Sequence, residues 1–166
     1  MVEVTMQVFR GDAERGEFKK YRVLIEEGMT VLDVVLAIQA SQAGDLAVRW
    51  NCKAGKCGSC SAEVNGRPRL LCMTRINLFP TGKPIIVSPM RTFPLIKDLV
   101  TDVSWNYEVE RQIPPFTPKP REPDGTYRMM QEDIDRVQEF HKCIECFLCQ
   151  DVCHVIRDHD KKKVFF

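Results

Sequence analysis

Four cysteines grouped in one short stretch form the pattern that is most able to do chemistry. Gaps of four, two and eleven residues separate them, and they are Cys52, Cys57, Cys60 and Cys72. C-x4-C-x2-C followed by a later cysteine is the spacing that binds a [2Fe–2S] cluster. Glycines within the loop tolerate positive φ and let backbone N–H groups approach the cluster sulfur atoms. The stretch therefore predicts a four-cysteine [2Fe–2S] site whose last ligand, Cys72, closes a short strand.

Three other uses of the same cysteines compete with the iron–sulfur interpretation. Zinc sites also use four cysteines, but they usually pair two short C-x2–4-C units rather than one loop and a distant residue. A disulfide framework needs an oxidising compartment, which nothing in the sequence suggests. Inert buried cysteines would not be concentrated among glycines. The loop pattern favours an iron–sulfur site over all three.

A second group of four cysteines follows near the end of the sequence. Its spacing is C-x2-C-x2-C-x3-C, and its members are Cys143, Cys146, Cys149 and Cys153. This run is typical of bacterial [4Fe–4S] proteins, and in two-cluster ferredoxins its fourth cysteine binds the other cluster. We therefore expect the first three to act together and Cys153 to bind a different centre.

Hydrophobic periodicity predicts mixed α+β structure around the first cysteine group. Residues 2–8 alternate apolar and polar side chains, and residues 18–26 form a second such stretch, which indicates a hairpin. Thr30 is a candidate N-cap for a buried helix over 31–40, with Asp33 placed as in a capping box. Short strands are expected at 61–64, 68–72 and 85–87.

The second half of the sequence changes character. Apolar residues at spacings of four predict a helical connector over 94–113, and a further helix is expected over 132–142. A proline-rich strap at 114–123 lies between them, and prolines at this density exclude a helix. We predict a [2Fe–2S] domain at 1–105 and the start of a helical domain at 106–166, which includes the strap.

Composition excludes several classes of protein. The net charge is +1 and 28% of residues are charged, so no basic field indicates nucleic-acid binding. No apolar run is long enough for a transmembrane helix, and the first residues lack the pattern of a signal peptide. Eight cysteines without an export signal indicate metal ligation in a reducing compartment. We also find no catalytic dyad and no phosphate-binding loop.

These features together resemble a known family. The loop C-K-A-G-K-C-G-S-C and the later P-L-I-K-D-L are similar to the iron–sulfur subunit of succinate dehydrogenase and fumarate reductase. The resemblance implies an N-terminal β-grasp domain of the plant-type ferredoxin kind, followed by a helical domain like a bacterial ferredoxin. It also implies a [4Fe–4S] cluster on Cys143, Cys146 and Cys149, and a [3Fe–4S] cluster to which Cys153 contributes.

The resemblance also carries expectations about what is missing and what departs from the pattern. The remaining ligands of the second and third clusters come from a later cysteine group in the family, so we expect the 166 residues to be incomplete at K-K-K-V-F-F. His154 stands where proline normally follows Cys153. It could donate to a cluster sulfide or lie near a quinone, or it could be a partly buried histidine bonded to backbone.

The chemistry and the resemblance lead to one function with two alternatives. Several iron–sulfur sites without a substrate site predict an electron-transfer subunit. The resemblance implies a flavoprotein partner with FAD that acts on succinate or fumarate, and a membrane anchor with quinone. We expect a peripheral position on the cytoplasmic face of a bacterial inner membrane rather than the mitochondrial matrix side. A stand-alone ferredoxin-type carrier and a zinc-binding interaction module are the alternatives.

Overall fold

The computed structural model describes residues 2–158, which form two compact units. The first unit contains residues 2–103 and 145–158, and the second is Ser104–Ile144. The lysine run at 161–163 and the residues after it, which carried the expectation of an interrupted chain, lie outside the described residues.

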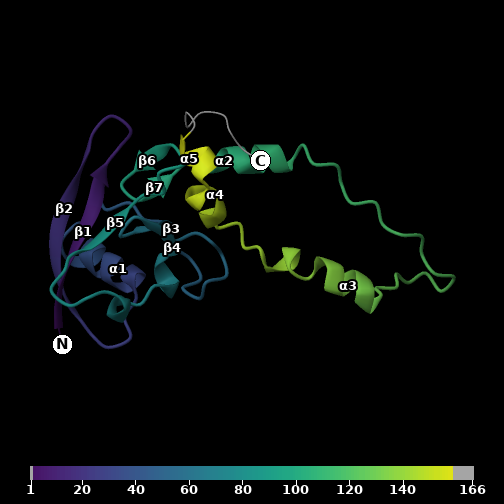
Figure 1. Cartoon of the computed structure of the whole chain (residues 1–166), viewed down its shortest axis with the longest axis horizontal. Helices are drawn as coiled ribbons and strands as arrows, with labels where there is room; N and C mark the ends of the chain where they lie inside the picture. Colours follow the sequence, from purple (N-terminus) through teal and green to yellow (C-terminus); the bar gives the residue numbers. More distant parts are fainter. Residues whose placement is uncertain (1, 159–166) are drawn as a thin grey trace. The chain divides into compact units, whose positions relative to one another are not determined.

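A five-stranded mixed sheet forms the body of the first unit (Figure 1). Its strands in chain order are β1 (Val2–Gly11), β2 (Gly16–Ile25), β3 (Ser61–Val64), β4 (Arg67–Leu70) and β5 (Ile85–Ser88). Their order across the sheet is β2-β1-β5-β3-β4, with β1 and β5 parallel and the other neighbours antiparallel. The predicted hairpin and the strands at 61–64 and 85–87 are confirmed, whereas the strand predicted over 68–72 ends at Leu70. This topology is the expected β-grasp arrangement.

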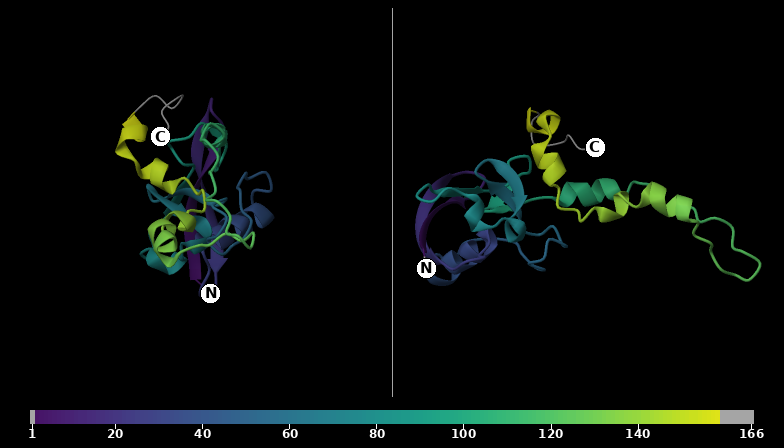
Figure 2. Two further views of the ribbon diagram at one scale, coloured as in Figure 1. Left: turned by 90° about the vertical axis from the view of Figure 1, so that its right-hand side faces the viewer. Right: turned by 60° about the horizontal axis from the view of Figure 1, so that its bottom comes forward.

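Helix α1 (Val31–Ser41) packs against one face of this sheet, which curves around it (Figure 2). Thr30 is the N-cap, and its side chain accepts from the backbone N–H of Asp33 while Asp33 accepts from the backbone of Thr30. This is the predicted capping box, which satisfies two of the backbone donors left free at a helix start. Val34, Val35 and Ile38 are fully buried against the sheet residues Met6 and Val8, so burial of apolar surface holds the two layers together.

The residues predicted as a helical connector begin instead as a hairpin. Strands β6 (Leu95–Lys97) and β7 (Val100–Thr101) pair antiparallel, and a helix, α2 (Ser104–Glu110), starts only afterwards. The prediction of helix over the whole of 94–113 was therefore wrong. Asp98 has a left-handed φ of 51° in the turn between the strands, which a continuous helix does not allow.

Buried Asp98 explains why this turn forms. Its carboxylate accepts from Arg10 Nε at 3.1 Å, from the Gly11 amide at 2.8 Å and from the Ala47 amide at 2.8 Å. One side chain therefore joins β1, the segment after α1 and the β6–β7 turn. Arg10 also donates to the Tyr21 hydroxyl at 2.9 Å, which extends the network to β2.

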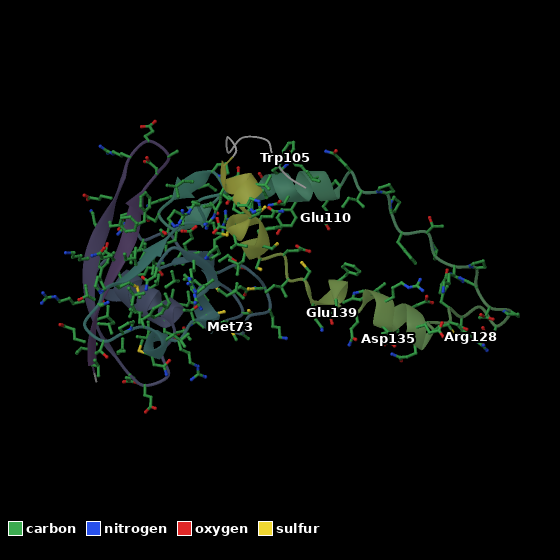
Figure 3. All side chains as sticks on the ribbon, viewed as in Figure 1. Met73, Trp105, Glu110, Arg128, Asp135 and Glu139 are labelled. Atoms are coloured by element: carbon green, nitrogen blue, oxygen red, sulfur yellow. The ribbon has the colours of Figure 1, made fainter. Side chains whose placement is uncertain are left out.

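The second unit contains α2, the proline-rich strap and α3 (Gln131–Val137). A 3-10 turn at Phe140–Lys142 replaces the end of the helix predicted over 132–142. The strap at 114–123 has no helix or strand and is almost wholly exposed, as the prolines predict. Figure 3 labels Glu139, whose carboxylate lies 2.5 Å from Lys142 Nζ.

Residues 145–158 return to the first unit as two short helices, α4 (Leu148–Val152) and α5 (His154–Asp158). Helix α4 contacts β4, and Asp151 and Ile156 are buried. In the chain described here, part of the second cysteine run is therefore packed on the domain that holds the first. The domain boundary at residue 105 stays a prediction.

Candidate metal centre

The loop that carries the first three cysteines is shaped by left-handed residues. Lys53, Gly55 and Gly58 have φ values of 54°, 66° and 68°. The curled backbone directs two amides, those of Ala54 and Lys56, at the sulfur of Cys52, each at 3.3 Å. Amides aimed at a ligand sulfur stabilise negative charge there. The loop thus directs two backbone donors at the sulfur of Cys52, as at a metal-ligating cysteine.

Gly55 has a left-handed φ of 66° and lies against a neighbouring side chain. A Cβ at this position would come within 2.9 Å of the side-chain Cγ and Sδ of Met73. Met73, labelled in Figure 3, directly follows Cys72 and is itself 59% exposed. Its side chain lies against the loop at Gly55, and a Cβ at this position would displace it.

The sulfur atoms of the first group are arranged in two pairs. Cys57 interacts with Cys52. The pKa of the Cys57 thiol is lowered to about 6 by hydrogen bonds from the Ser59 hydroxyl, the Cys52 amide and the Ser59 amide. Cys60 is paired with Cys72, whose backbone amide donates to the Cys60 sulfur at 3.5 Å. Burial raises the pKa of the Cys60 thiol to about 11.

Cys72 is held in place by contacts with the helix start. It lies in a 3-10 turn, Leu71–Met73, rather than at the end of a strand as predicted, because β4 stops at Leu70. The Leu71 amide donates to the Cys60 carbonyl at 3.0 Å. The carbonyl of Thr74 then accepts from the Val31 amide at 2.8 Å. The capped end of α1 therefore fixes the position of the fourth thiol.

This arrangement fits a two-iron cluster. Such a cluster takes four cysteine thiolates, two at each iron, and the structure offers two sulfur pairs with amides directed at them. Within residues 2–158, no three histidine, cysteine or acidic side chains gather closely enough to hold a single metal ion, whereas a structural zinc ion needs four donors around one point. The donor set and its pairing favour the predicted [2Fe–2S] site on Cys52, Cys57, Cys60 and Cys72.

The second cysteine run is divided between the two units. Cys146, Cys149 and Cys153 belong to the first unit, whereas Cys143 ends the 3-10 turn of the second unit. Cys143 and Cys149 are exposed, and Cys146 and Cys153 are half-buried. The predicted set of Cys143, Cys146 and Cys149 around one [4Fe–4S] cluster therefore remains a prediction, as does the role of Cys153.

His154 begins α5 and its side chain is exposed. The interpretation of His154 as a partly buried histidine bonded to backbone is therefore wrong. Its place directly after Cys153 keeps it beside the last cysteine of the run.

Four charged residues, which we call the docking network, fasten residues 145–158 to the sheet. They are Glu63, Arg91, Asp151 and Arg157. Glu63 is 2% exposed on β3 and accepts from Arg91 Nε and Nη2 at 2.8 Å each and from Arg157 Nη2 at 2.7 Å. Arg157 also donates to the Asp151 carbonyl.

The carboxylate of Asp151 completes this attachment. It accepts from the Thr92 amide at 3.1 Å, and its Oδ2 lies 3.9 Å from Arg157 Nη2. Burial raises the pKa of Asp151. Sequence analysis missed this network, because nothing in S-A-E-V distinguishes a buried glutamate from a surface one, and its partners come from distant parts of the chain.

Comparison with known proteins places this geometry in context. Residues 2–108 match the family model described as a 2Fe-2S iron-sulfur cluster binding domain. The fumarate reductase iron-sulfur subunit of Mycobacterium tuberculosis is 35% identical over 161 residues, which is 93% of this chain and 65% of that protein. The fumarate reductase iron-sulfur subunit of Wolinella succinogenes is 32% identical over 90% of this chain and 66% of that protein.

A solved structure is also similar. One chain of the Mycobacterium smegmatis Sdh1 complex in the apo form matches with a TM-score of 0.90 and 60% identity, over 95% of this chain and 66% of that chain. Our chain thus spans just under two thirds of the length of these three relatives.

Proposed function

The chain belongs to the family of 2Fe-2S iron-sulfur cluster binding domains, and from this premise we propose that it transfers electrons within a succinate dehydrogenase or fumarate reductase. The observation that carries the proposal is the curled loop with two sulfur pairs and amides aimed at Cys52. An iron–sulfur cluster there would accept and release one electron at a time. The chain's own residues would hold the cluster ligands, direct amides at Cys52 and fix Cys72 against α1.

The proposed cofactors extend beyond this first site. Cys143, Cys146 and Cys149 would contribute to a [4Fe–4S] cluster, and Cys153 to a [3Fe–4S] cluster. The spacing of the run supports this assignment, and so does the similarity to iron-sulfur subunits of fumarate reductases.

The proposed partners are a flavoprotein that carries FAD and acts on succinate or fumarate, and a membrane anchor that binds quinone. The similarity to a chain of the Mycobacterium smegmatis Sdh1 complex supports a bacterial setting. Among the described residues no helix has both the length and the apolar character to cross a bilayer. We propose a peripheral position on the cytoplasmic face of the inner membrane. The relatives named as subunits favour this function over a stand-alone carrier.

One experiment tests the central assignment. The complex is purified through an affinity tag on this chain, and its iron, zinc and electron paramagnetic resonance (EPR) spectra are measured after reduction with dithionite and with succinate. We expect a one-electron [2Fe–2S] signal that is absent from the Cys57→Ala variant. Stoichiometric zinc without iron, or a [2Fe–2S] signal that survives Cys57→Ala combined with Cys60→Ala, would refute the assignment.

We also propose that exposed His154 lies near the quinone, and a second experiment tests this position. We expect His154→Ala to slow succinate-driven reduction of quinone and to leave reduction of an artificial dye nearly unchanged. His141→Ala is the matched control, because His141 is also exposed but lies outside the cysteine run. Loss of both activities in the His154 variant would indicate a defect in assembly, and unchanged activities would exclude a quinone role.

A further inference from the structure

Ser61 connects the two cysteine runs directly. It follows Cys60 and begins β3, and it is only 9% exposed. Its hydroxyl lies 2.8 Å from the carbonyl oxygen of Gly58 and 2.9 Å from the carbonyl oxygen of Cys146. A serine hydroxyl has one proton to donate, so the two carbonyls share it. The hydroxyl therefore joins the first cysteine loop to a residue 85 positions away.

The backbone at Cys146 needs such a contact. Its neighbours Glu145 and Phe147 both have left-handed φ values, 54° and 57°. A non-glycine residue in this region is strained and persists only where the surroundings hold it. The rings of Phe147 and Phe93 contact each other with centroids 6.1 Å apart, which fixes one side of Cys146. The Ser61 hydrogen bond fixes Cys146 itself.

The docking network does not replace this contact, because it acts further along the segment. Its residues on the returning chain are Asp151 and Arg157, which follow Cys146 by more than a helical turn. The segment is therefore attached at two places, by Ser61 near Cys146 and by the network at the α4–α5 end. Removal of one attachment is expected to loosen its own end first.

We propose that Ser61 is a positioning residue that sets the distance and contact between the two cysteine sites. The inference rests on the proposed function, because the sites matter as a pair only if electrons pass between them. Cys60 would hold the first centre and Cys146 the second, and an electron passed between such centres would require no proton transfer. Ser61 keeps its proton and supplies a bonded route, since electronic coupling falls less steeply through bonds and hydrogen bonds than across a gap.

The first test needs no cluster and uses the 166-residue chain. Amide hydrogen exchange is compared in the wild type and in Ser61→Ala. Loss of a hydrogen bond worth about 1 kcal/mol is expected to increase local opening about fivefold, so exchange at residues 146–149 should accelerate by this factor. Exchange at residues 154–157 should change less. Unchanged exchange at 146–149 would overturn the proposal.

A matched pair of variants isolates the hydroxyl from the shape of the side chain. Threonine and valine have nearly the same volume and both suit a strand, but only Ser61→Thr keeps a hydroxyl. We expect slow exchange in Ser61→Thr and fast exchange in Ser61→Val. The pair also decides the question if Ser61→Ala does not accumulate as folded protein. Equal exchange in the two variants would show that the hydroxyl does not position Cys146.

The second test uses the purified complex and reads the two centres separately. Samples are frozen at intervals after a one-electron reduction, and EPR follows when each centre becomes reduced. Ser61→Val is expected to slow arrival of the electron at the second centre, with Ser61→Thr restoring the rate. The potential and spectrum of the first centre are recorded in each variant, because the lost hydroxyl also contacts the Gly58 carbonyl. Equal rates in the two variants would overturn the proposal. If the wild type holds no iron–sulfur centre, the proposed function fails, while the exchange measurements still decide the position of Ser61.

Discussion

Replacement of Glu63 by glutamine tests how much the docking network stabilises the protein. The glutamine keeps the shape of the side chain and removes its charge, so the Arg91 and Arg157 guanidinium groups lose their shared carboxylate. Removal of one partner from a buried ion pair costs about 3–5 kcal/mol. The side chain of Arg91 is 53% exposed, and solvent screens its share, so we expect Glu63→Gln to cost about 2–3 kcal/mol.

Urea denaturation followed by circular dichroism measures this cost. For a chain of this size the same loss corresponds to a decrease in Tm of about 4–12 °C. Glu17→Gln is the matched control, because its ion pair with Lys19 spans 3.6 Å between side chains that are 72% and 53% exposed. The control is expected to change stability by no more than about 0.5 kcal/mol.

A double-mutant cycle separates the network from a general effect of the substitution. Glu63→Gln and Arg157→Gln share a contact of 2.7 Å, so their effects should deviate from additivity by about 0.5–3 kcal/mol. A Glu63→Gln variant as stable as Glu17→Gln would refute the reasoning. Strict additivity with Arg157→Gln would show that the two residues act independently and that Arg157 does not fasten the segment through Glu63.

Three further predictions concern the first unit. Cys57→Ala combined with Cys60→Ala should abolish the iron bound by the first site, as measured by elemental analysis, and retained iron would contradict the assignment. Asp98→Asn should destabilise the chain by about 2–3 kcal/mol in urea, because a buried charge that holds Arg10 is removed, and an unchanged midpoint would contradict this role. The pKa of Asp33 is lowered in the folded chain: burial acts to raise it, but hydrogen bonds from the Thr30 backbone and hydroxyl outweigh burial. The contribution of ionised Asp33 to the free energy of unfolding is therefore complete above its ordinary pKa of about 4 and is lost as the pH falls through its lowered pKa in the folded chain. The stability of Asp33→Asn should therefore differ from that of the wild type at pH 7 and converge with it towards pH 2.

Local signals in the sequence predicted those parts of the structure that local chemistry determines. The cysteine spacing located the curled loop, and the Thr30 and Asp33 pair located the start of α1. The failure at residues 95–101 has a clear reason. Leu95 and Leu99 are spaced as on a helix face, but long-range bonds from Asp98 to the end of β1 and to the Ala47 amide impose a hairpin.

The contacts between distant segments could not be predicted from the sequence. Ser61 and Glu63 lie in a short strand whose four residues are all buried, and an alternating pattern would have placed some of them in solvent. Their partners, Cys146 and Arg157, come from the segment that returns to the sheet. Because such pairs depend on tertiary structure, no spacing rule indicates them.

The topology of the sheet has a consequence for how the chain folds. Cys60 and Cys72 lie only twelve positions apart across the β3–β4 hairpin, and Cys52 and Cys57 share one loop. The parallel pairing of Met6 with Ile85 joins the sheet across a far longer stretch of chain. Long loops close slowly relative to local contacts. We therefore expect each cysteine pair to come together early in folding, before the parallel strands meet, and the contact of Thr74 with the start of α1 then to fix Cys72.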